Sequence, residues 1–154
     1  MLLQKLRKRV GARLNGDSEA GFTLVELLVV MLILGLLAAI AIPSFFNQRD
    51  KAKDASAKEA VRTAETAMET YSTDHNGSYV GATPTALRTI ESTLNDVGAN
   101  LAVNSANAND YEIQVTSPDT GNVFKISRLS TGITNQTCTT GGTAGCPTGG
   151  NWGT

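Results

Sequence analysis

The hydrophobic pattern of the chain is dominated by one uninterrupted apolar segment. Residues 22–42 read FTLVELLVVMLILGLLAAIAI, and only Thr23 and Glu26 among them are polar. Since an α-helix rises about 1.5 Å per residue, a helix of this segment extends roughly 32 Å, close to the hydrocarbon thickness of a bilayer. The segment is therefore predicted to cross a membrane once.

A second helical pattern follows Pro43 and continues to about Asn76. Small and apolar residues recur there at spacings of three and four, which predicts one face that packs on a sheet. These residues are Ala57, Ala60, Val61, Ala64, Ala67, Met68 and Tyr71. The opposite face is predicted to be charged, with Asp54 and Lys58 as a favourable i,i+4 pair. The dipeptide Asn76-Gly77 predicts the end of the helix.

The remaining residues, 77–154, predict a small α+β head. Thr83-Pro84 is typical of a helix start, and an amphipathic helix is expected from there to Gly98. Apolar residues then alternate with polar ones at 111–115 and 124–127, which predicts two strands, and a third is expected near 133–138. The C-terminal segment TTGGTAGCPTGGNWGT is rich in Gly and Thr and predicts a surface loop.

Charge gives the chain a direction across the membrane. Five of the 13 Lys and Arg residues precede the apolar segment, namely Lys5, Arg7, Lys8, Arg9 and Arg13. The positive-inside tendency therefore predicts residues 1–21 in the cytoplasm and residues 43–154 outside. A cleaved secretory signal is the competing interpretation, but it requires a shorter apolar run with small residues after it. Here Ala20-Gly21 precedes the run.

The boundary GFTLVELLVV, together with Gly35 and Pro43, resembles the type IV prepilin family over residues 20–43. The resemblance implies that a prepilin peptidase removes residues 1–21 by cutting after Gly21 and methylates the amine of Phe22, which leaves 133 of the 154 residues. It also implies a pilin-like fold, with an apolar transmembrane and polymerisation helix at 22–43, an amphipathic helix at 44–76 and a globular head at 77–154.

Glu26 is the one ionisable group inside the apolar segment. Near the cytoplasmic end of a membrane helix a carboxylate costs little, but in a bundle of such helices an unpaired charge is expensive. There is no Lys or Arg between Phe22 and Gln48. The nearest candidate cation is the α-amino group that cleavage at Gly21 creates, which is mostly protonated near pH 7. An interface glutamate without a partner is the alternative.

The apolar segment also carries small residues suited to helix packing. Gly35 and Ala39 form a small-xxx-small pair, accompanied by Ala38 and Ala41, and such residues let neighbouring helices approach closely. Simple single-span anchoring is the alternative explanation. Because proline removes a backbone donor, a kink or a local loss of helicity is expected between Gly35 and Pro43.

The two cysteines, Cys138 and Cys146, are predicted to form a disulfide, since the head lies in a compartment that permits one. A zinc site would need four ligands, and only His75 accompanies the two cysteines. No metal or cofactor site is therefore assigned, and His75 is expected to be solvated. Calcium binding by the polar run that ends in Asp110 and Glu112 is the alternative to a turn rich in Asn and Asp.

The sequence contains no combination of residues that suggests catalysis, so a non-enzymatic structural protein is expected. The resemblance implies a homopolymer in an extracellular type IV pilus, with a prepilin peptidase, an assembly platform driven by a cytoplasmic ATPase and the cytoplasmic membrane as partners. A pseudopilin of a type II secretion system is the closest alternative, and a membrane-anchored monomeric enzyme or receptor is another. Nucleic-acid contact by the basic residues of the second helix is conceivable but not indicated, because the whole chain has no basic excess.

Overall fold

The computed structural model describes residues 21–139 and 141–153. The expected leader, apart from Gly21, lies outside the described residues. The chain divides into two compact units, one ending at Ile42 and one formed by Pro43–Thr154. We describe each unit by itself.

Helix α2 extends from Leu24 to Asp74 and includes Pro43. The large hydrophobic side chains of residues 22–42 are all exposed, as for Phe22 at 77% and Leu32 at 73%. The helix is continuous between Gly35 and Pro43, so a local loss of helicity, one of the two expectations for this segment, is wrong for the isolated subunit. Proline removes only one i→i−4 hydrogen bond, and the Leu- and Ala-rich turns nearby are strong helix formers.

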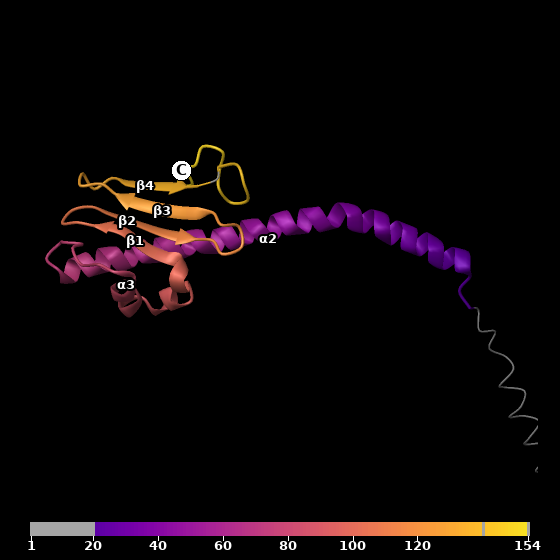
Figure 1. Ribbon diagram of the computed structural model, residues 1–154, viewed down its shortest axis with the longest axis horizontal. Helices are drawn as coiled ribbons and strands as arrows, with labels where there is room; N and C mark the ends of the chain where they lie inside the picture. The colour runs from indigo at the N-terminus through magenta and orange to yellow at the C-terminus, as the bar shows by residue number, and fades with distance from the viewer. Residues whose placement is uncertain (1–20, 140, 154) are drawn as a thin grey trace, which may run out of the picture. The chain divides into compact units, whose positions relative to one another are not determined.

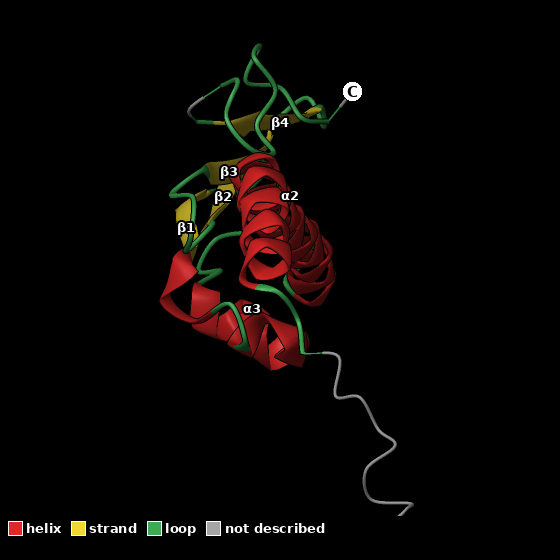
Figure 2. Cartoon of the chain, turned by 90° about the vertical axis from the view of Figure 1, so that its right-hand side faces the viewer, coloured by secondary structure: helices red, strands yellow, loops and turns green. Residues whose placement is uncertain are grey.

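The head consists of the C-terminal half of α2 packed against one face of an antiparallel sheet (Figure 2). The strands are β1 (Leu101–Ala106), β2 (Tyr111–Thr116), β3 (Val123–Arg128) and β4 (Thr134–Cys138). They follow one another in the sheet in chain order, and each pairs antiparallel with the next (Figure 1). The α+β fold class predicted from the sequence is therefore confirmed.

The core lies between α2 and the inner face of the sheet. Alternate residues of β2 and β3 point inward, and those of the central register are fully buried: Tyr111, Ile113, Val115, Phe124 and Ile126. From α2 the predicted face is buried as well, with Val61, Ala64 and Met68 at 0% exposure. The small side chains on this face allow the helix axis to approach the strands closely. The predicted stop is confirmed too, because Asn76 and Gly77 have positive φ angles and the Gly77 amide donates to the Ser72 carbonyl oxygen.

The segment after α2 differs from the prediction of a single helix to Gly98. Helix α3 covers only Pro84–Ile90 and is followed by two 3-10 turns, η1 (Ser92–Asn95) and η2 (Gly98–Asn100). Its start is as predicted, because the Thr83 hydroxyl accepts from the Ala86 amide. The break occurs at Glu91, whose backbone is extended and whose carboxylate accepts from the Thr93 amide. A side chain that caps the next turn competes with continuation of the helix.

Strand β1 was not predicted. Only Leu101 and Val103 carry an alternating signal, and the register shifts between Val103 and Ser105. A bulge shifts which residues point inward and which point outward. A short edge strand with a bulge therefore lacks the regular alternation of apolar and polar residues by which strands are predicted. The polar run before β2 is the sequence feature that indicates the β1–β2 hairpin. Asn107 and Asp110 close its turn through backbone and side-chain hydrogen bonds.

We expect the core of the sheet to dominate the stability of the head. Ile126 is fully buried, whereas Ile133 is 59% exposed. Ile126→Ala should lower the free energy of unfolding by about 2–5 kcal/mol, because it removes transfer energy and leaves a cavity. The matched control Ile133→Ala should change it by less than about 0.5 kcal/mol. Denaturant unfolding of the full chain in detergent micelles measures both, and equal costs would contradict the assigned core.

Candidate functional site

The start of α2 is a capping box formed by Thr23 and Glu26. The Glu26 amide donates to the Thr23 hydroxyl at 3.2 Å, and the Glu26 carboxylate accepts from the Thr23 amide at 3.3 Å and from its hydroxyl at 3.4 Å. The pattern T-x-x-E before an apolar run is the sequence signature of this motif and could have predicted it. In the isolated subunit Glu26 therefore holds the first turn of the helix, and within the described part of the chain no cation pairs with it.

Gly21 and Phe22 precede this cap and lie outside the helix. A Cβ atom on Gly21 would meet nothing within 4 Å, and Phe22 is 77% exposed. The peptide bond between them is therefore accessible and lies outside the hydrogen-bonded helix. A larger residue at position 21 has no steric conflict within the subunit itself.

The small residues of the apolar segment are not needed for packing within one subunit. A Cβ atom on Gly35 would also meet nothing within 4 Å. Helix α2 is the one described helix long and apolar enough to cross a bilayer. The structure thus leaves Gly35 and the apolar side chains around it available for lipid or for other helices.

Asp54 forms the main polar link inside the head, and its burial corrects the prediction that it lies on a charged outer face. Its carboxylate is fully buried. It accepts from the Asn122 side-chain amide at 2.7 Å, from the Gly145 backbone amide at 2.8 Å and from the Thr120 hydroxyl at 2.5 Å. Three separate segments therefore meet on one side chain: α2, the turn between β2 and β3, and the C-terminal loop.

These hydrogen bonds decide the protonation state of Asp54. Burial raises the pKa of its carboxyl, but the bonds from Thr120, Asn122 and Gly145 outweigh burial and hold the pKa below its ordinary value. Lys58 does not pair with Asp54 as predicted. Its ammonium donates instead to the Gly145 carbonyl oxygen at 2.6 Å. Asp54 and Lys58 of α2 therefore bind the backbone amide and the carbonyl oxygen of Gly145. A Cβ atom added at Gly145 would lie only 2.5 Å from the Asp54 Cβ.

The predicted disulfide between Cys138 and Cys146 is present. It closes the loop that carries Gly145 onto the end of β4. The chain then returns to the sheet, where Trp152 is buried and its indole N–H donates to the Thr137 carbonyl oxygen at 2.8 Å. The C-terminal segment is irregular, as predicted, but its two ends are fixed to β4.

Several of the basic residues of α2 are used within the head. Lys58 lies 5.3 Å from the ring centre of Phe124, and the Arg62 guanidinium lies 5.0 Å from that of Trp152. Lys53 pairs with Asp119 at 3.3 Å. These contacts place much of the positive charge of α2 against the aromatic residues and the turn of the head.

A second polar cluster lies toward the C-terminal end of α2. The Glu69 carboxylate accepts from the Tyr79 hydroxyl at 2.9 Å and from the Tyr111 hydroxyl at 3.0 Å, with Arg128 at 3.8 Å. Burial and the negative charge of Glu69 raise the pKa of both tyrosines. Burial and the same charge raise the pKa of Glu65. The cluster links α2 to β2 and to the segment that leaves the helix.

Comparison with known proteins identifies a matching family and several similar proteins. Residues 17–42 match the family described as "Prokaryotic N-terminal methylation motif". The "Fimbrial protein" of Pseudomonas aeruginosa is 30% identical over 112 residues, covering 73% of this chain and 69% of the relative. The "Type IV major pilin protein PilA" of Myxococcus xanthus is 43% identical over 51 residues, covering 33% of this chain and 23% of the relative.

Secretion proteins match as well, over a shorter part of the chain. "Type II secretion system core protein G" of Pectobacterium carotovorum is 36% identical over 62 residues, which covers 40% of each chain. The alignments with these secretion relatives thus span about two fifths of their length. No solved structure gives a significant match.

The fold and the N-terminal motif together define a pilin-like protein, in which one long helix has an apolar N-terminal half and supports an α+β head with its second half. The chain belongs to the type IV pilin (prepilin) family, whose members are non-enzymatic structural proteins. The family relationship does not separate pilins from secretion pseudopilins, since both are among the relatives.

We expect Asp54→Asn to destabilise the head by about 3 kcal/mol, because a neutral amide replaces a carboxylate that accepts several buried hydrogen bonds. The matched control is Asp119→Asn, which removes the partly exposed pair with Lys53 and should cost less than about 1 kcal/mol. Denaturant unfolding of the full chain in micelles compares them. A control that costs as much as Asp54→Asn would contradict the assigned role of the buried carboxylate.

The same pair of variants gives a pH dependence with a defined sign. Because the pKa of Asp54 is lowered on folding, its stabilisation is present above the unfolded value near 3.8 and is lost as the pH falls through the folded pKa. The wild type should therefore lose stability more steeply below about pH 4 than Asp54→Asn does. Unfolding curves between neutral and acid pH measure the difference, and parallel curves would show that Asp54 does not titrate with folding.

Proposed function

We propose that this chain is the structural subunit of a type IV pilus, polymerising through residues 22–43 into an extracellular filament that serves adhesion, twitching motility or DNA uptake. The observation that carries the proposal is the alignment with the fimbrial protein. Its 112 residues are too many to be confined to residues 1–76, so the likeness extends into the head. The secretion relatives align over only about 60 residues.

Processing at the N-terminus is the first step of the proposed function. A prepilin peptidase cuts between Gly21 and Phe22 and methylates the new amine of Phe22. The match to the methylation motif over residues 17–42 supports this step, and so does the accessible bond ahead of the helix cap. Until assembly the subunit resides in the cytoplasmic membrane, with residues 1–21 inside and the head outside. It has no catalytic role of its own.

Assembly then transfers the apolar half of α2 from lipid to other subunits. The exposed side chains of residues 24–42 and the unfilled space at Gly35 support close packing of neighbouring helices. In such a bundle Glu26 pairs with the α-amino group of Phe22 on its own chain or a neighbour. An assembly platform driven by a cytoplasmic ATPase carries out the transfer.

A pseudopilin of a type II secretion system is the second candidate, and the matches to core protein G favour it. The amount of surface filament separates the two functions. Cells that express the chain at its native level are sheared, and the sheared fraction is assayed for the subunit by mass spectrometry. A pilus subunit is abundant there and is lost on gene deletion together with visible filaments, whereas a secretion pseudopilin remains with the cells.

Processing makes a direct prediction for Gly21. Gly21→Val should leave the full precursor in the membrane, because the peptidase must fit this residue while the subunit itself has space for a side chain. Intact-mass analysis of the membrane fraction distinguishes precursor from processed chain. Normal maturation of the variant, or surface filaments of the wild type that begin at Met1, would contradict the proposed cleavage.

Glu26 makes the sharper prediction, because its two roles are separable. Glu26→Gln retains an oxygen acceptor for the capping box but loses the charge, whereas Glu26→Ala loses both. Both variants should insert and be cleaved, and both should give fewer filaments. An ion pair at 4 Å is worth about 1 kcal/mol in water and about 4 kcal/mol at an effective dielectric near 20, before desolvation is subtracted.

The measurement is the ratio of subunit in sheared filaments to processed subunit in membranes. If Glu26→Gln assembles normally while Glu26→Ala does not, the residue acts through the helix cap and the counter-ion role is wrong. Normal assembly of both variants would remove Glu26 from the mechanism.

A further inference from the structure

The C-terminal loop is bound to α2 at the residue that directly precedes Cys146. The Gly145 amide donates to the Asp54 carboxylate at 2.8 Å, and the Lys58 ammonium donates to the Gly145 carbonyl oxygen at 2.6 Å. Asp54 and Lys58 are four residues apart on α2, so they lie on the same side of the helix, one turn apart. We call these two hydrogen bonds to Gly145 the α2 latch.

Hydrogen bonds within the loop position Cys146 relative to Gly145. The Cys146 amide donates to the Thr143 carbonyl oxygen, and the Gly142 amide donates to the Cys146 carbonyl oxygen, both at 2.9 Å. The Asn122 side-chain amide also donates to the Thr143 carbonyl oxygen, at 3.3 Å. Once the latch has bound Gly145, these backbone contacts determine where Cys146 lies, and none of them involves a sulfur atom.

Cys138 is positioned by strand pairing. It lies opposite Phe124 in the pairing of β3 with β4, and its amide donates to the Gly150 carbonyl oxygen at 2.7 Å on the other side of β4. The Trp152 amide donates to the Gln136 carbonyl oxygen at 3.1 Å and holds the same edge. The two cysteines are therefore brought together by contacts that do not require the disulfide.

The buried carboxylate favours docking of the loop in the reduced chain as well. Asp54 is fully buried, so each donor that replaces water on its carboxylate lowers the free energy of the head. Without the loop the carboxylate retains the Thr120 and Asn122 donors but loses the Gly145 amide. An undocked loop therefore carries an energetic cost whether or not the two sulfur atoms are joined.

We propose that the α2 latch binds Gly145 before the disulfide forms, and thereby places Cys146 beside Cys138 in a folded head that awaits oxidation. The oxidant is a small disulfide or a disulfide-bearing protein. One cysteine thiolate attacks it and expels a thiolate, and the other cysteine thiolate attacks the resulting mixed disulfide and expels a second one. The head loses two electrons, the oxidant gains them, and the two cysteine protons end on the released thiols.

This inference goes beyond the proposed function, because it concerns the head alone. It applies equally to a pilus subunit and to a secretion pseudopilin, and its failure would leave the choice between them unaffected. It assigns to Asp54 and Lys58 a positioning role in disulfide formation, in addition to their role in the stability of the finished head.

Equilibration with glutathione tests the proposal on the full chain in detergent micelles. The chain is incubated with mixtures of reduced and oxidised glutathione, the free thiols are alkylated, and both forms are counted by mass spectrometry. The equilibrium constant has the unit of a concentration and gives the effective concentration of one cysteine for the other. We expect a value in native buffer about 30-fold or more above the value in denaturant, because a latched head already brings the cysteines together.

Two variants disrupt the latch in different ways. Lys58→Met keeps the aliphatic part of the side chain but removes the ammonium donor to the Gly145 carbonyl oxygen. Gly145→Ala leaves every charge in place but adds a Cβ atom 2.5 Å from the Asp54 Cβ. Each should lower the effective concentration in native buffer about tenfold and leave the value in denaturant unchanged.

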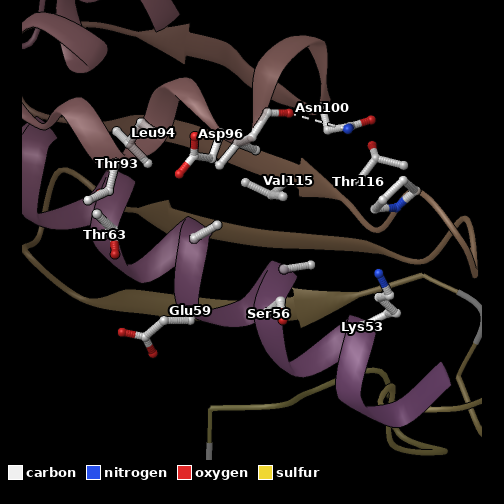
Figure 3. A pocket seen from close by; sticks show the side chains of 14 residues that line it. Lys53, Ser56, Glu59, Thr63, Thr93, Leu94, Asp96, Asn100, Val115 and Thr116 are labelled. Atoms are coloured by element: carbon white, nitrogen blue, oxygen red, sulfur yellow. Dashed lines mark hydrogen bonds between the residues drawn. The ribbon is translucent and has the colours of Figure 1, made fainter. Parts of the chain in front are cut away.

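Each latch variant has a matched control. Lys53→Met removes an ammonium group from the same helix, but Lys53 pairs with Asp119 and lines a groove of about 480 Å³ together with Val115 and Thr116 (Figure 3). Gly149→Ala adds a Cβ atom in the same C-terminal segment, where it would meet nothing within 4 Å. Both should keep the effective concentration within about twofold of the wild-type value.

A third control separates positioning from general stability. Ile126→Ala weakens the core of the sheet in the reduced and the oxidised head alike. The effective concentration depends on the difference between these two forms, so it should stay within about twofold of wild type. Circular dichroism of each reduced variant reports whether its head is folded, and Lys58→Met decides the test if the reduced Gly145→Ala head is unfolded.

Three outcomes would overturn the proposal. The first is a wild-type effective concentration that is equal in native buffer and in denaturant. The second is a wild-type value in the folded latch variants. The third is a loss in the controls as large as the loss in the latch variants, which would show that the cysteines respond to stability in general rather than to the latch.

Discussion

The head depends on a carboxylate that carries a negative charge in a fully buried position. Asp54 accepts hydrogen bonds from a turn and from a loop that are far from it in the sequence, and within the described residues it forms no salt bridge. A buried charge is tolerated only when several donors replace its water. The turn between β2 and β3 and the C-terminal loop therefore have to close around α2 together. The disulfide holds the loop in the place where Gly145 can donate.

Helix α2 meets two requirements along one chain. Its first part is apolar on every side, which suits lipid or a bundle of identical helices. Its second part is apolar on one stripe, where small side chains lie against β2 and β3, and polar elsewhere. Thr23 and Glu26 begin the helix, and Asn76 and Gly77 end it with left-handed backbone. Local hydrogen bonds and backbone conformation therefore determine where the helix begins and ends. The hydrophobic pattern of each part determines whether it is suited to lipid, to other helices or to the sheet.

The features that sequence reasoning found are those with strong periodicity or a specific motif. The apolar segment, the buried face of α2, strands β2 to β4 and the Cys138–Cys146 bridge were all predicted correctly. The face of α2 was readable because seven small or apolar residues repeat at helical spacing. The N-terminal motif gave the family.

The missed features are a distant set of hydrogen bonds, an irregular strand and a local cap. Asp54 reads as a surface residue, since an acid four residues before a lysine is typical of a solvated helix face. Only the fold brings Asn122 and Gly145 to it. Strand β1 was hidden by its bulge, and Glu91 ended α3 through a cap that competes with an otherwise continuous apolar pattern. Only Asp54 was missed because of distant partners, whereas α3 ends at a local side-chain cap and β1 is irregular.

The contact between Gly145 and Asp54 also bears on how the surface of this protein can evolve. The loop is exposed at most of its positions, and a side chain at Gly149 would meet nothing within 4 Å. Substitutions there change the exposed surface of the head without disturbing the core. Position 145 has no such freedom, because any side chain would collide with Asp54 at 2.5 Å. The surface of the loop can therefore vary in sequence around a glycine that the buried carboxylate keeps fixed.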